Sequence, residues 1–230
     1  MRYSRIDSGV VALAIGTTML AVSARTAPAQ VPAGWSAYTD GSQDYTVRAD
    51  VSRREGGQGY AGATIRANVV SPRGTAMLAQ SVRADAYRGK RVRLSSFLKT
   101  IGVEEGAAAL WMRIDGPHGV LASDFMESRP IMGTNDWALH DVVLDVPANA
   151  VGITFGFLLS GGGQAWMDDV AFDVVGSEVA VTGHAGGLYP EVRPVAGDAP
   201  PRERTQRSAY LRAPDQPVNM SLRSTGRTGL

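Results

Sequence analysis

The chain has 230 residues, of which 44% are apolar and 20% are charged, with a formal net charge of +1 and no cysteine. These values are typical of a globular protein and exclude a wholly disordered, a collagen-like or a polytopic membrane chain. A chain of this length buries enough surface to fold without a disulfide or a metal ion. We therefore expect one folded domain between two ends of different composition.

Residues 1–29 have the pattern of a secretory signal peptide. Arg2 and Arg5 form a basic start, an apolar stretch follows over residues 10–22, and small-residue cleavage sites come after it. The apolar stretch is about 13 residues long, too short to cross about 30 Å of hydrocarbon as a stable helix. We expect a periplasmic or secreted mature chain that has no membrane contact after cleavage. An oxidising compartment permits disulfides without requiring them.

Residues 30–175 alternate apolar and polar side chains at a period of two, interrupted by turn residues about every ten positions. Around Met112, for example, apolar residues alternate with Trp111 and Arg113, so one face of this strand is core and the other faces water. Strands with one buried face must pair two sheets, which predicts an all-β fold, a single antiparallel β-sandwich of jelly-roll-like type. The expected strands are 45–51, 63–70, 76–83, 91–98, 108–115, 139–146, 152–159 and 165–175.

Charge argues against a nucleic-acid partner. The body, residues 30–175, holds 13 Lys and Arg against 16 Asp and Glu, a net charge of −3. No run of basic residues follows one face, as a DNA-binding surface would require. A small net charge also gives little long-range attraction to phosphate.

Residues 176–230 lose the alternating pattern. Six prolines lie there among Arg, Gly, Ser and Thr, and such a segment buries too little apolar surface to offset the entropy of ordering it. We expect a disordered tail. An adhesive or anchoring tail is the alternative, but its seven Arg alternate with five acidic residues and form no dense basic block.

Three segments carry a family resemblance: YRGKRVRLSSFLKT at 87–100, LWMRIDGPHGVLASDFMESRPIMGTNDW at 110–137, and 139–175, which ends in WMDDVAFDVV. Together they resemble an exported bacterial β-sandwich module of the carbohydrate-binding, galactose-binding-like type. The resemblance extends less securely back to residue 34. Relatives of this type are labelled hypothetical proteins or transcriptional regulators. The resemblance implies a fold more directly than a function.

Modules of this type open with an Asn-x-x-Phe-Glu strand, whose Glu joins an Asp pair of the last strand around a structural calcium. That opening is absent here, and a late string, 217–223, is similar to it but ends in Arg223 in place of the acid. Calcium needs six to eight oxygen ligands, and Asp168 and Asp169 offer only part of that set. We therefore expect no metal and no cofactor, and we expect these two aspartates to form hydrogen bonds that close the end of the sandwich.

Enzyme signatures are absent. The sequence has no Gly-x-Ser-x-Gly elbow, phosphate-binding loop, His-Glu-x-x-His or cysteine-based metal spacing. Its three histidines are scattered. Two carboxylates would suffice for a glycosidase, yet no pair among the acidic residues is singled out by the sequence. We expect a protein that is not an enzyme and has no catalytic residues.

Aromatic residues indicate where a ligand would bind. Trp137 is expected to pack at the edge of the sandwich. Trp166 has the parity of buried neighbours and is expected in the core. Trp111 has the parity of polar neighbours, so it is expected on an outer face, where an indole can stack on a sugar ring while charged groups bind its hydroxyls. The predicted ligand groove is made of Trp111, Arg113, Asp115, Asp124 and Arg129.

Two alternatives to this groove remain open. The segment 116–136 is expected to be a long loop, which can equally fold over Trp111 and bury it. Asp124 and Arg129 can equally form an ion pair that pins this loop.

Three functions follow, in order of preference. The first is an exported, non-catalytic binding module for glycans or other surface ligands. The second is a structural or interaction module that binds a protein of the envelope, for which a plain sandwich is sufficient. The third is transcriptional regulation, the label that relatives carry, which conflicts with the export signal and with the lack of a helix-turn-helix pattern. The sequence does not indicate an oligomeric state.

Overall fold

The structure, a computed structural model, describes residues 31–40, 43–50, 62–186 and 210–222. The elements in these ranges are ten strands: β1 (Ser36–Thr39), β2 (Tyr45–Asp50), β3 (Gly62–Ala67), β4 (Thr75–Arg83), β5 (Arg91–Gly116), β6 (Gly119–Asp124), β7 (Ile131–Asp145), β8 (Gly152–Ser160), β9 (Gln164–Val175) and β10 (His184–Ala185). All strand pairs are antiparallel. The predicted all-β, antiparallel class is therefore confirmed. No helix within the described ranges is long and apolar enough to cross a membrane.

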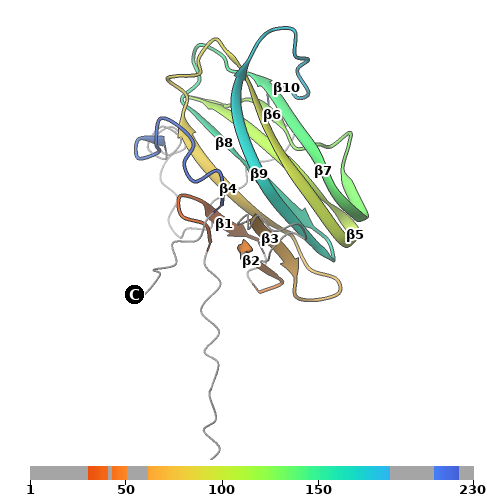
Figure 1. Ribbon diagram of the computed structural model, residues 1–230. Coiled ribbons are helices and arrows are strands. Elements are labelled where there is room, and N and C mark those ends of the chain that lie inside the picture. Colours follow the sequence, from red (N-terminus) through yellow and green to blue (C-terminus); the bar gives the residue numbers. More distant parts are fainter. Residues whose placement is uncertain (1–30, 41–42, 51–61, 187–209, 223–230) are drawn as a thin grey trace, which may run out of the picture.

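The long strand β5 belongs to both layers of the molecule. Its first part pairs with β7 on one side and β9 on the other, whereas its second part pairs with β6 and β8. One layer therefore has the order β7-β5-β9-β3-β2, and the other has the order β6-β5-β8-β4-β1, with β10 added to β6. Figure 1 shows β9, β5 and β7 running side by side along the length of the molecule.

The two layers pack face to face through a continuous apolar core. Phe155 of β8 stacks on Phe172 of β9 with ring centroids 4.8 Å apart, although these strands lie in different layers. Trp35 meets Phe155 edge-on at 5.9 Å and closes the core near β1. The largest fully buried side chains are Phe155, Phe157, Ile65, Leu78, Leu94, Leu98, Leu110, Met112, Ile114, Met126, Leu144 and Ile153.

The predicted strands agree with the observed ones in most of the core, and the main differences lie in the middle of the chain. The strands expected at 91–98 and 108–115 are parts of the single strand β5. Between them, Gly102 and Glu105 have positive φ, so the backbone bends from one layer to the other without ending the strand. The loop expected at 116–136 was wrong in its extent, because it contains β6 and the start of β7.

The prediction of a disordered tail over 176–230 is wrong for two segments. Residues 176–186 run along β7 and end in β10, and residues 210–222 pack on the sandwich. Tyr210 and Leu222 are buried at the two ends of the second segment. Sequence periodicity does not reveal such a segment, because it is attached by single buried residues and has no alternating apolar pattern. The predicted signal peptide, 1–29, and the residues 187–209 of the predicted tail lie outside the described ranges.

Candidate functional site

The five residues of the predicted groove lie on two sides of one sheet. Trp111, Arg113 and Asp115 point to the outer face of the layer containing β8. Asp124 pairs with Met112, whose side chain is in the core, so it lies on the opposite side of the sheet. Alternation along β5 and β6 therefore separates the five residues, and they do not form one groove.

The expectation that Trp111 is an open platform is wrong. Its side chain lies on the outer face as predicted, but it is only 5% exposed. The indole stacks on Phe125 with ring centroids 5.2 Å apart and an interplanar angle of 6°. Phe125 follows β6 immediately, so the segment after that strand folds over Trp111, which is the alternative that the sequence left open.

Arg113 and Asp115 form a buried ion pair on the same outer face. The Arg113 Nη2 and the Asp115 Oδ2 are 3.0 Å apart, and the Tyr210 hydroxyl donates a hydrogen bond to the same oxygen. Burial acts to lower the pKa of Arg113, but Asp115 and Tyr210 together raise it overall. Thr154 lies 2.7 Å from the Tyr210 hydroxyl and completes the cluster.

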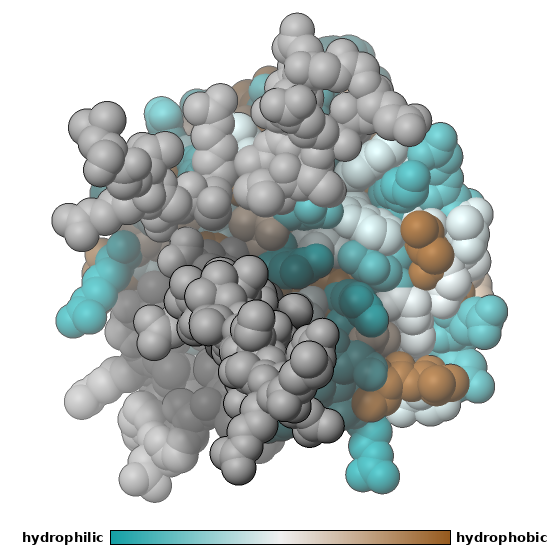
Figure 2. Space-filling model, turned by 60° about the horizontal axis from the view of Figure 1, so that its bottom comes forward, coloured by the Kyte–Doolittle hydropathy of each residue, from teal (hydrophilic) through white to brown (hydrophobic). Residues whose placement is uncertain are grey.

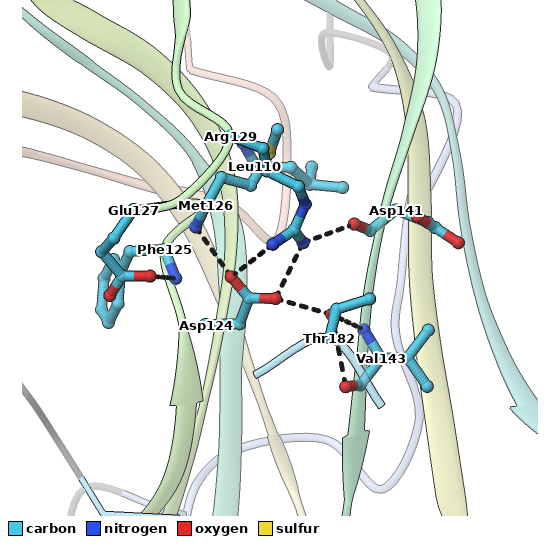
Figure 3. Close-up of polar contacts among 9 residues, drawn as sticks. All are labelled: Leu110, Asp124, Phe125, Met126, Glu127, Arg129, Asp141, Val143 and Thr182. Carbon is cyan, nitrogen blue, oxygen red and sulfur yellow. Dashed lines mark hydrogen bonds and ion pairs between the residues drawn. The ribbon is translucent and has the colours of Figure 1, made fainter. Parts of the chain in front are cut away.

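Asp124 is the centre of a second buried cluster (Figure 3), which fixes the loop after β6. Its carboxylate accepts hydrogen bonds from Arg129 at 2.8 Å, from the backbone N–H of Met126 at 2.7 Å and from the Thr182 hydroxyl at 2.6 Å. Burial acts to raise the pKa of Asp124, but these donors lower it overall. Arg129 also donates to the Asp141 carbonyl oxygen. This is the loop-pinning ion pair that the sequence allowed, and it ties β6 to β7 and to residues 176–186.

The outer face of the other layer carries the aromatic residues that a ligand can reach. Trp166 of β9 lies directly opposite Lys99 of β5, and Lys99 alternates with the buried residues of β5. Trp166 therefore points outward, and the expectation that it is a core residue is wrong.

A β-bulge in β9 explains this error. Between Ser95 and Phe97 the pairing with β9 shifts by one residue, and Asp169 in the bulge has a φ of 53°. One extra residue reverses which side chains of a strand face inward. Parity with Val170 was thus misleading, because Val170 and Asp169 are the two bulge residues that lie opposite Ser96.

Trp137 belongs to the same outer face. It lies in the edge strand β7, as the sequence prediction placed it at an edge, within a register shift between Ala138 and Asn135. Its neighbour Asp136 lies 3.4 Å from the outward-facing Lys99, and Leu139 pairs with the outward-facing Phe97, so this part of β7 borders the same outer face. Adjacent strands are about 4.8 Å apart, so Trp137 and Trp166, on the two strands that flank β5, attach to backbones roughly 10 Å apart. We call the following set the tryptophan face: Phe97, Lys99, Trp137, Leu139, Gln164 and Trp166.

This face combines partly exposed rings with polar groups. Trp137, Trp166 and Phe97 are half-buried, and Leu139 is 60% exposed. The Lys99 ammonium lies 3.4 Å from the Asp136 carboxylate. In the described part of the surface seen in Figure 2, hydrophobic residues stand in small groups among hydrophilic ones. Rings separated by charged and amide groups fit a ligand with both apolar and hydroxylated faces.

Of Asp168 and Asp169, the pair considered for calcium, Asp169 lies in the bulge with Val170, and Asp168 pairs in register with Phe97. Asp168 is buried and accepts a hydrogen bond from the backbone N–H of Asp169 at 2.7 Å. The Ser96 hydroxyl donates to the backbone carbonyl of Asp168 at 2.6 Å. The described ranges contain no group of three or more His, Cys, Asp or Glu arranged to hold a metal ion.

No protein-family model matches the chain. A curated relative, the uncharacterised HTH-type transcriptional regulator YbfP of Bacillus subtilis (strain 168), is 43% identical over 151 residues, which make up 65% of this chain and 50% of that protein. The chain thus spans about half the length of the curated relative that it matches. The match covers 151 residues. This is more than residues 1–29 and 176–230 combined, so part of the sandwich must lie within the match.

Solved structures with a similar fold belong to several functional classes. The enzymatically active domain of tailspike protein 4 from bacteriophage CBA120 has a TM-score of 0.50 and 17% identity, over 62% of this chain and 20% of that chain. The CBM22-1 xylan-binding domain from Paenibacillus barcinonensis Xyn10C has a TM-score of 0.42 and 13% identity, over 62% of this chain and 86% of that domain. At these identities the similarity concerns the fold alone. The all-β, antiparallel fold described above is the class that the sequence predicted.

Proposed function

We propose that this protein is a non-catalytic binding module that holds a glycan on the tryptophan face. The observation that carries the proposal is the placement of Trp137 and Trp166 on either side of Lys99, on one outward sheet face. An indole stacks on the apolar face of a pyranose ring, and flanking amide and ammonium groups bind its hydroxyls. Two rings about two strands apart suit a chain of sugars that runs across the strands.

A flat sheet face suits binding more than catalysis. Lys99, Gln164 and Asp136 are polar groups beside the rings, and only Asp136 among these three is a carboxylate, whereas glycoside hydrolysis uses a pair of carboxylates. We propose that the chain binds its ligand without transforming it. Export as a periplasmic or secreted protein, with removal of residues 1–29, is part of the same proposal, because glycans of the cell surface are met there.

A second function is favoured by one observation, the 43% identity to a protein named as a transcriptional regulator. In this alternative the sandwich is the ligand-sensing half of a longer regulator. Both functions use the same ligand face, but they differ in compartment. Fractionation of cells that express the full chain separates them, because a regulator must remain in the cytoplasm and an exported module loses residues 1–29.

The experiment that tests the glycan proposal is a glycan-array screen of the full chain, followed by calorimetric titration of the best ligand. Replacement of Trp137 or Trp166 by Ala is expected to weaken binding by about 1 to 3 kcal/mol, the scale of aromatic stacking on a planar ring. The melting temperature is expected to change less than on loss of a core residue, because both rings lie on the outer face and are only partly buried.

Tyr38 provides the matched control. It is an aromatic residue that is 43% exposed, more than either tryptophan, and it lies on β1 in the other layer. Replacement of Tyr38 by Ala is expected to leave affinity unchanged. Equal losses for the Tyr38 and Trp166 variants, or no glycan bound at all, would contradict the proposal.

A further inference from the structure

The Tyr210 side chain fills a recess in the outer face of the layer opposite to the tryptophan face. The ring lies directly over Gly152, where an added Cβ would come within 2.1 Å of a ring carbon. Its hydroxyl donates to Asp115 and lies 2.7 Å from the Thr154 hydroxyl. Gly152, Thr154, Asp115 and Arg113 thus form a cradle for a ring with one hydroxyl, which we call the tyrosine recess.

The floor of this recess has hydrogen-bonding capacity that the described chain does not use. The Asp115 side chain is about 1% exposed, and its three donor contacts, from Arg113 and Tyr210, all reach Oδ2. Among the described residues Asp115 Oδ1 has no hydrogen-bond partner. Buried polar atoms are normally paired, so this unused acceptor, on a side chain that is almost fully buried, points to a ligand.

The two ends of the segment that contains Tyr210, residues 210–222, are held by contacts of different kinds. Its far end is fixed, because Leu222 is fully buried and the Gln80 side chain forms two hydrogen bonds with the Val218 backbone. Near Tyr210 the side-chain contact is an exposed ion pair between Arg83 and Asp215, a type of contact that contributes little to stability. Apart from the contacts of Tyr210 itself, the hydrogen bond from the Arg83 amide to the Pro214 carbonyl and this exposed ion pair hold the near end of the segment.

We propose that the tyrosine recess is a binding site for a phenolic ring. In the absence of a ligand, Tyr210 of the same chain fills this site, and a ligand can displace it. A buried carboxylate next to a hydroxyl acceptor selects a neutral hydroxyl donor and repels an anion. Gly152 has no side chain, so there is room for a flat ring above it. Burial and the nearby Asp115 raise the pKa of Tyr210, so its hydroxyl stays a donor at neutral pH, as an incoming phenol would.

The first test uses Tyr210→Gly, which empties the recess without changing its walls. The probe is p-cresol, which has the ring, methyl group and hydroxyl of a tyrosine side chain, and toluene is the control without the hydroxyl. We expect p-cresol to raise the melting temperature of this variant in a saturable way and toluene to do so far less. Equal effects of the two compounds, or no effect of either, would overturn the proposal. If the variant does not fold unaided, the same comparison is made on its refolding yield.

The role of the carboxylate is tested by adding Asp115→Asn to the Tyr210→Gly variant. Loss of one hydrogen bond to a charged group corresponds to about a tenfold or larger loss of affinity for p-cresol. The matched control is Asp145→Asn, which removes an exposed carboxylate that also pairs with an arginine, on β7. Unchanged affinity with Asp115→Asn would overturn the assignment of Asp115 as the acceptor.

Displacement is tested on the unaltered full chain by hydrogen exchange. Addition of p-cresol is expected to speed exchange of the Arg83 amide, which donates to the Pro214 carbonyl, and to leave the amides of β8 unchanged. If Tyr210→Gly binds p-cresol but the full chain shows no faster exchange, the recess is a permanent part of the core and displacement in cis is wrong. These outcomes are independent of glycan binding, since the tryptophan face lies on the other layer.

Discussion

Trp166 lies opposite Lys99 on the outside of the sheet, although Val170, four residues later, is buried on the inside. The bulge at Asp169 and Val170 makes this relationship possible, because one extra residue reverses the alternation of β9. The presence of a tryptophan on the proposed ligand face thus depends on a backbone irregularity.

Deletion of Asp169 is expected to restore regular alternation and to turn Trp166 toward the core or Val170 toward water. Either change removes a ring from the tryptophan face or breaks the core, so glycan binding should be lost and stability should fall. Tryptophan fluorescence and calorimetric titration measure the two effects. The control is Asp169→Gly, which keeps the bulge, since glycine adopts a φ near 53° without strain. Loss of binding in the glycine variant would contradict this explanation.

Trp111 is expected to behave as a core residue. Replacement by Ala removes an indole that is stacked on Phe125 and 95% covered, and it should lower the free energy of unfolding by roughly 3 to 5 kcal/mol. Denaturant unfolding measures the change. Glycan affinity of the folded fraction should stay unchanged. A variant that is as stable as the wild type but no longer binds glycan would show that Trp111 is a ligand-binding residue.

The sequence was sufficient for the parts of the fold that depend on regular alternation. Leu110 and Met112 were correctly assigned to the core, and the outward direction of Trp111 was also correct. Alternation along one strand does not reveal what packs on its outer face, so the burial of Trp111 by Phe125 could not be read from β5 alone. A positive φ at a non-glycine residue such as Asp169 leaves no distinct sequence signal, and for that reason the orientation of Trp166 was missed.

Contacts between residues that are far apart in the chain also could not be predicted from the sequence. Tyr210 meets Asp115 over a separation of 95 residues, and a single tyrosine in a proline-rich segment has no periodicity to mark it. Asp124 and Arg129 were correctly recognised as a possible pair because they are five residues apart. Their third partner, Thr182, lies 58 residues from Asp124 and gave no such signal.

Asp124 is expected to make stability depend on pH in the acid range. Its pKa is lowered in the folded state from the usual 3.8, so its contribution is full above that value and is lost as the pH falls through the lower, folded-state pKa. Asp124→Asn should cost about 3 to 5 kcal/mol at pH 7, because Arg129 loses its buried partner. The difference between variant and wild type in denaturant unfolding should shrink below about pH 4. A difference that stays constant down to pH 2 would contradict this role.

His140 should add a second acid-sensitive step at higher pH. It is half-buried, and burial together with the nearby Arg129 lowers the pKa of His140 below its usual 6.5. The unfolded chain therefore takes up a proton before the folded chain does, so stability should start to fall as the pH drops below 6.5. His140→Gln should remove this step and keep the Asp124 step. Unfolding titrations between pH 7.5 and about 4.5 compare the two proteins, and identical slopes would exclude His140 as the source.

Gly152 is expected to be needed because the Tyr210 ring occupies the space of its missing side chain. Gly152→Ala would place a methyl group 2.1 Å from a ring carbon, so the ring must move, and overpacking of this kind costs about 1 to 3 kcal/mol. The Tyr210 hydroxyl should then leave Asp115, and the Arg83 amide that binds Pro214 should exchange faster. The control is the same substitution in the Tyr210→Gly variant, where no ring is present to be displaced. There Gly152→Ala should cost clearly less, and the two substitutions should be non-additive by an amount that a double-mutant cycle measures. Full additivity would mean that the alanine acts on β8 itself, and that Tyr210 and Gly152 are not coupled in the way their contact suggests.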